Sequence, residues 1–92
     1  MESAVGAHLA NAAATGAFEL FYWRDRNLEV DFVLRGRGRI VAIEVKSGRA
    51  RSALPGLAAF SAAFRPQRKL LVGGDGLPLE QFLLKPAEDW VR

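Results

Sequence analysis

The chain has 92 residues, half of them hydrophobic and a quarter charged, with a formal net charge of +3. These values predict one small globular domain and exclude a disordered chain. Because there is no cysteine and only one histidine, disulfides and metal sites built from cysteines or clustered histidines are excluded, so any bound metal would have oxygen ligands.

The first predicted element is an alanine-rich helix over residues 2–14, which Thr15 and Gly16 would end. Its apolar residues recur at helical spacing, and Glu2 lies on the same face as those residues. We therefore expect Glu2 to face the rest of the domain.

Three strands are predicted next, over residues 18–24, 28–35 and 40–47, joined by turns at 24–27 and 36–39. In the third strand Glu44 and Lys46 share one face, because side chains alternate along a strand. Strict alternation in the second strand predicts two faces, one with Val30, Phe32 and Leu34 and the other with Glu29, Asp31 and Val33.

A helix over 52–64, with Ser52 as its N-cap, and a short buried strand over 69–74 complete a crossover in which this strand runs parallel to the third. Residues 77–84 are expected to form an edge strand and 86–91 a helical turn. The predicted fold is an α/β sandwich in which helices flank a central mixed sheet of three antiparallel strands plus a parallel crossover strand.

The acidic residues on the second and third strands are the strongest functional signal. Two desolvated carboxylates, Asp31 and Glu44, repel each other, so one must take a proton unless a cation lies between them. Mg²⁺ prefers such oxygen ligands, and Asp31, Glu44 and the carbonyl of Val45 are candidate ligands. Lys46 is then placed to act as a base or to stabilise charge on a phosphate. The same spacing also fits a surface ion pair between Glu44 and Lys46, with Asp31 solvated.

Basic residues are concentrated around this site. The segment from Arg24 to Lys69 holds eleven Lys and Arg against four Asp and Glu, which suits a polyanion but also fits a solvated surface. Four arginines flank the proposed site in sequence and are candidate phosphate ligands: Arg24, Arg26, Arg49 and Arg51. The neighbouring aromatics Phe18, Phe21, Tyr22 and Trp23 are expected to fill the core in preference to stacking on bases.

An Asp, a turn and then Glu-Xaa-Lys on the next strand resembles the PD-(D/E)XK nuclease superfamily, with Asp31, Glu44 and Lys46 at the matching positions. More narrowly, residues 2–13, 21–34 and 40–48 resemble the DUF4143 domain found at the C-terminus of bacterial and archaeal AAA-type ATPases. The resemblance implies a restriction-endonuclease-like fold over residues 1–92. It also implies that Glu2 is a fourth member of the site.

The resemblance implies two functions. One is a nucleic-acid-binding domain, acting on DNA in preference to RNA, that hydrolyses phosphodiesters with Mg²⁺ or Mn²⁺ through Glu2, Asp31, Glu44 and Lys46. The other is an inactive DNA-docking or protein-interaction module, which is favoured because residues 52–64 lack the Gln or Lys found in many active relatives. The chain would be the C-terminal part of a larger protein whose ATPase domain lies upstream, since no Walker A pattern is present for ATP.

The short apolar runs and the absence of a signal-peptide pattern predict a cytoplasmic protein without a membrane partner. Whether the domain forms a homodimer is left open by the sequence.

Overall fold

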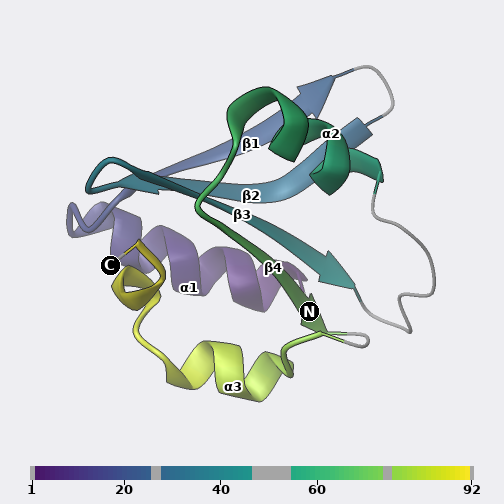
Figure 1. Cartoon of the computed structure of the whole chain (residues 1–92). Coiled ribbons are helices and arrows are strands. Elements are labelled where there is room, and N and C mark those ends of the chain that lie inside the picture. Colours follow the sequence, from purple (N-terminus) through teal and green to yellow (C-terminus); the bar gives the residue numbers. More distant parts are fainter. Residues whose placement is uncertain (1, 26–27, 47–54, 74–75, 92) are drawn as a thin grey trace.

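The computed structural model of the protein describes residues 2–25, 28–46, 55–73 and 76–91. In chain order the elements are α1 (Glu2–Ala14), β1 (Glu19–Asp25), β2 (Leu28–Gly36), β3 (Arg39–Lys46), α2 (Pro55–Phe64), β4 (Arg68–Gly73), α3 (Leu79–Leu84) and the 3₁₀ helix η1 (Ala87–Val91) (Figure 1). Within these ranges, no helix combines the length and the apolar composition needed to cross a membrane. The first helix, the four strands and the final helical turn confirm the sequence predictions.

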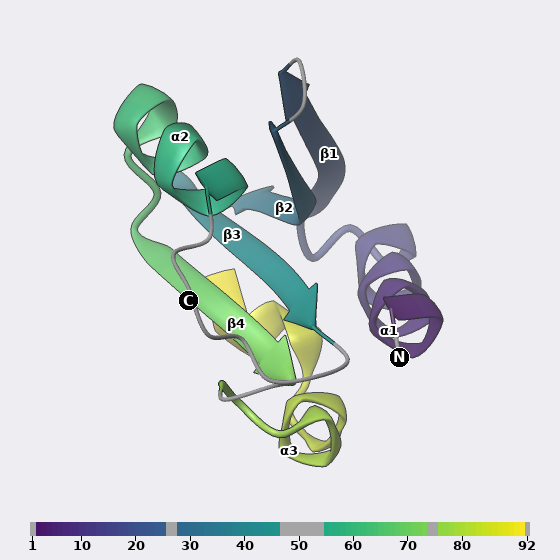
Figure 2. The same ribbon diagram turned by 90° about the vertical axis from the view of Figure 1, so that its right-hand side faces the viewer.

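The four strands form one mixed sheet in the order β1-β2-β3-β4. Strand β2 pairs antiparallel with both β1 and β3, whereas β3 and β4 run parallel, and the crossover between these two includes α2. Figure 2 shows α1 and α2 on opposite sides of this sheet. The predicted α/β sandwich is therefore confirmed. The predicted N-cap, Ser52, lies outside the described residues.

A two-residue turn joins β2 to β3 and fixes how these strands align. Arg37 and Gly38 have φ angles of 54° and 73°. A two-residue hairpin turn of type I′ requires positive φ at both of its central residues. Gly36 then pairs with Arg39, and the same register continues to Phe32 opposite Ile43. One further step along it would place Asp31 opposite Glu44.

The larger apolar core lies between the sheet and the layer formed by α1, α3 and η1. From α1, Val5 and Leu9 are fully buried against Val41 and Ile43 of β3. The single histidine, His8, donates from Nε2 to the carbonyl oxygen of Lys85 at 3.0 Å, which ties α1 to the chain after α3. Helix α1 is thus held on this face by apolar and polar contacts together.

The predicted edge strand over residues 77–84 was wrong, because Leu79–Leu84 form helix α3. Spacing explains the difference, since Leu79, Phe82 and Leu83 fall on one helical face and pack against the larger core. Phe82 is fully buried, and its ring stacks on Trp90 with centroids 5.7 Å apart. As a strand, the same segment would turn alternate members of this group away from the core.

The smaller core lies under α2, on the opposite face of the sheet. Leu57 and Phe60 of α2 pack there against Val30, Val33 and Ala42. The helix approaches β2 so closely at Gly56 that an added Cβ would overlap the backbone of Glu29. A glycine is therefore required at this contact.

A β-bulge interrupts β2 beside the end of this core. Phe21 pairs with Val33 and Trp23 with Val30, so two steps along β1 match three steps along β2. Asp31 and Phe32 together therefore oppose the single residue Tyr22. The predicted strict alternation was wrong here, because the extra residue turns Val30 to the face of Val33 in the α2 core while Phe32 and Leu34 face α1.

Candidate functional site

Two carboxyl groups bridge β2 and β3 where their backbone pairing ends. The last pair of the ladder is Phe32 with Ile43. Beyond it, the backbone N–H of Asp31 donates to Glu44 Oε1 at 3.3 Å, and the N–H of Val45 donates to Asp31 Oδ2 at 2.8 Å. Each strand therefore supplies an acid that accepts a backbone hydrogen bond from the other, which brings Asp31, Glu44 and Val45 together.

The surroundings of Glu44 disfavour its charge. It is 7% exposed and is the one buried polar or charged residue among those that the structure describes. Burial, a hydrogen bond to the Asp31 carboxyl group and the negative charge of Asp31 raise the pKa of Glu44 from 4.5 to about 7, although the Asp31 N–H and the positive charge of Lys46 oppose this. The pair therefore carries a proton over part of the neutral range, as expected for a buried carboxyl group beside a second carboxyl group without a cation.

Lys46 lies two residues beyond Glu44 at the end of β3, on the same face of the strand. Lys46 is half-buried, and its positive charge is close enough to lower the pKa of Glu44. The surface ion pair weighed from the sequence is not what forms, because Glu44 is buried and bonded to Asp31.

The fourth predicted member, Glu2, begins α1. Figures 1 and 2 both place this end of α1 at the end of the sheet where β3 finishes. The Glu2 side chain lies outside the described part of the structure. The role of Glu2 in the site therefore stays a prediction.

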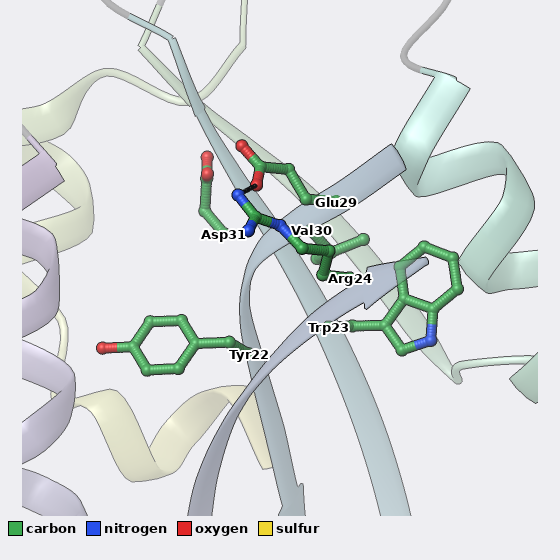
Figure 3. Close-up of a pocket in the computed structure, with 6 residues that line it drawn as sticks. All are labelled: Tyr22, Trp23, Arg24, Glu29, Val30 and Asp31. Atoms are coloured by element: carbon green, nitrogen blue, oxygen red, sulfur yellow. Dashed lines mark hydrogen bonds and ion pairs between the residues drawn. The ribbon is translucent and has the colours of Figure 1, made fainter. Parts of the chain in front are cut away.

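An open pocket of about 330 Å³ leads to Asp31 from the side of β1 (Figure 3). Its walls carry Arg24 and Glu29, whose exposed side chains form an ion pair at 3.1 Å. Figure 3 shows Tyr22 and Trp23 projecting to opposite sides of β1. The pocket lining is Tyr22, Trp23, Arg24, Glu29, Val30 and Asp31.

Of the four predicted phosphate-binding arginines, Arg24 therefore lies in the pocket that contains Asp31. The other three, Arg26, Arg49 and Arg51, lie outside the described residues.

Sequence reasoning missed Tyr22 as a residue of the site. Phe18 is buried as predicted, but Tyr22 is 74% exposed and Phe21 39% exposed, so the prediction that this aromatic group fills the core was wrong for these two. No signal in the sequence marks Tyr22, because its position depends on the bulge that it faces from the edge strand.

The donor set fits a hard divalent cation. Asp31 and Glu44 present carboxylate oxygens in one place, and a cation between them would offset both the burial and the negative charge of Asp31 that raise the pKa of Glu44. Among the described residues no group of three or more His, Cys, Asp or Glu side chains gathers as a metal site. A cation held here would complete its coordination with water, phosphate oxygens or the Val45 carbonyl, as Mg²⁺ commonly does.

Comparison with known proteins identifies the family. Searches of curated proteins and of solved structures gave no significant match. Residues 1–83 match the sequence profile described as "Domain of unknown function (DUF4143)". This match covers most of the 92 residues, so the chain belongs to the DUF4143 family.

Proposed function

We propose that this domain binds nucleic acid and hydrolyses its phosphodiester backbone with Mg²⁺ or Mn²⁺ at the Asp31–Glu44 pair. The observation that carries the proposal is the meeting of two acids across the separated ends of β2 and β3, beside Lys46. The resemblance of Asp31 and Glu44-Xaa-Lys46 to the PD-(D/E)XK pattern supports the same reaction.

Each residue has a distinct role in this proposal. Asp31 and Glu44 bind the cation, and their hydrogen bonds across the strands hold both carboxyl groups in place beforehand, so less conformational freedom is lost on binding. The cation would supply Lewis-acid polarisation of the phosphate and a more acidic water. Lys46 Nζ stabilises negative charge on the phosphate or accepts a proton from the attacking water, and Glu2 is the proposed fourth member.

A non-catalytic docking module, serving an ATPase domain of the same protein, is the second candidate. Helix α2 has no Gln or Lys, and its Ser61 hydroxyl donates to the Leu57 carbonyl at 2.8 Å. This helix therefore supplies no side chain of the type that assists catalysis in many PD-(D/E)XK nucleases.

A cleavage assay separates the two candidates. The purified domain is incubated with Mn²⁺ and labelled DNA or RNA, single-stranded and duplex. We expect cleavage that falls at least about 100-fold in Asp31→Asn and in Lys46→Ala, the scale of losing one charge-stabilising or acid–base group. Glu80→Gln, on the exposed face of α3, is the control and should cut like the wild type. Binding without cleavage under all these conditions would favour the docking module.

Metal binding can be tested without any substrate. Ten dissociation constants of Mn²⁺ should stabilise the wild type by about 1.4 kcal/mol. The effect should be larger at pH 8 than at pH 5, because Glu44 loses its proton as pH rises through about 7. Thermal unfolding with Mn²⁺ or with EDTA measures this shift, which Asp31→Asn should abolish. An equal shift in wild type and variant would place the cation elsewhere.

A further inference from the structure

Tyr22 occupies an unusual position for a large aromatic side chain. It lies on β1, which forms one edge of the described sheet, and it is 74% exposed. Its ring contacts Phe32 at a centroid distance of 5.9 Å with the planes tilted by 43°. One side of the ring is thus supported by the protein while most of its surface remains in water.

Two hollows of the surface adjoin Tyr22. Tyr22 lines the pocket that contains Asp31, and it lines a second hollow with Ser3 and Gly6 of α1. Its ring projects from β1 on the side opposite Trp23 (Figure 3). The exposed ring therefore lies beside the pocket that leads to Asp31.

The chemistry of the first hollow identifies the ligand class. Its lining combines aromatic rings with the charged groups of Arg24, Glu29 and Asp31, which suits a ligand that is both planar and polar better than an apolar peptide. Nucleic-acid bases stack on exposed aromatic rings whatever their sequence, and Arg24, which lines the same hollow in an ion pair with Glu29, supplies a cation for the phosphate that follows. The bases of an intact duplex are already stacked on one another and cannot offer a face to Tyr22.

We propose that Tyr22 stacks on an unpaired base next to the phosphate held at Asp31 and Glu44, so that the substrate of this site is single-stranded nucleic acid. This inference rests on the proposed function, because it places the base relative to the proposed phosphate site. It adds a substrate class and a specificity residue that the acid pair alone does not define.

Binding measured without cleavage tests the proposal. Fluorescence anisotropy with a labelled thymidine 20-mer, in EDTA, is compared with the same length of duplex and with a strand of abasic sugar-phosphate. Tyr22→Ala should weaken binding to the 20-mer by roughly 5- to 100-fold, the range for losing one stacked base. Tyr22→Phe and Tyr22→Trp keep the planar ring and should bind like the wild type. Leu84→Ala removes another exposed apolar side chain, 84% exposed on α3, and should change nothing.

The outcomes separate this inference from the proposed function. The abasic strand should bind the wild type as weakly as the thymidine strand binds Tyr22→Ala. Asp31→Asn should retain Tyr22-dependent binding even though it loses cleavage. If Tyr22→Ala binds the 20-mer as tightly as the wild type does, or if the abasic strand binds equally well, stacking is wrong while hydrolysis stands. If the wild type binds none of the strands, both proposals fail.

Discussion

Replacing Glu44 with Gln is expected to stabilise the folded domain above pH 7 and to leave its stability unchanged below pH 4.5. The pKa of Glu44 rises from 4.5 to about 7 on folding, so between these values the folded chain binds more protons than the unfolded chain. The unfolding free energy of the wild type therefore falls as pH rises from 4.5 to 7, and the whole loss is present above pH 7. The rise in the pKa of Glu44 makes this loss roughly 3 kcal/mol. Gln keeps an acceptor for the Asp31 N–H and has no proton to lose.

Urea unfolding from pH 4 to pH 8 in EDTA measures the effect. The difference in unfolding free energy between Glu44→Gln and wild type should grow with pH by up to about 1.4 kcal/mol per pH unit. Comparing two chains cancels the contributions of the other carboxylates. Glu80→Gln, which removes an exposed carboxylate, should show no such trend. A difference between Glu44→Gln and wild type that does not vary with pH would mean that Glu44 titrates normally in the folded state.

Gly56→Ala is expected to destabilise the domain by about 2 kcal/mol or more, the scale of overpacking against a rigid neighbour. The new Cβ would overlap the backbone of Glu29, which cannot move aside as a side-chain tip can. Helix α2 would have to shift away from β2, and the contacts of Leu57 and Phe60 with the smaller core would loosen. Thermal unfolding monitored by circular dichroism measures the loss.

Gly6→Ala is the matched control for this substitution. Both changes place alanine in a helix, where it is favoured over glycine by about 1 kcal/mol. At Gly6 the nearest atom to the new Cβ is Cζ of the Phe32 ring at 3.3 Å, which needs to move by only a few tenths of an ångström. The control should therefore be nearly neutral. Equal losses in the two variants would show that the close backbone contact at Gly56 is unimportant.

The sequence was sufficient for most of the fold because its elements have clear periods. Val5 and Leu9 mark the inner face of α1, and the glycine turn at Gly38 sets the β2–β3 register. The α3 segment failed for a physical reason. A run of six residues with four apolar positions fits either an edge strand or a short helix. The choice is made by the larger core, into which the helix packs Phe82.

The candidate site was predicted in part. The turn register is enough to place Asp31 opposite Glu44, and burial of Glu44 follows from the apolar residues around it. The bulge was not predictable from alternation, because an extra residue in a strand has no distinct composition at Asp31 and Phe32. Tyr22 was missed for the same reason, since a strand aromatic is exposed or buried according to the register of its neighbour.

The bulge also means that a plain antiparallel ladder and an acid pair differ, in this sheet, by a single residue of β2. Asp31 is the one residue between Val30 and Phe32, so deleting it would restore equal counts along β1 and β2 and would also remove one acid of the pair. A chain with this topology can therefore acquire or lose a polar centre by a one-codon insertion or deletion, without any change in the order of its strands.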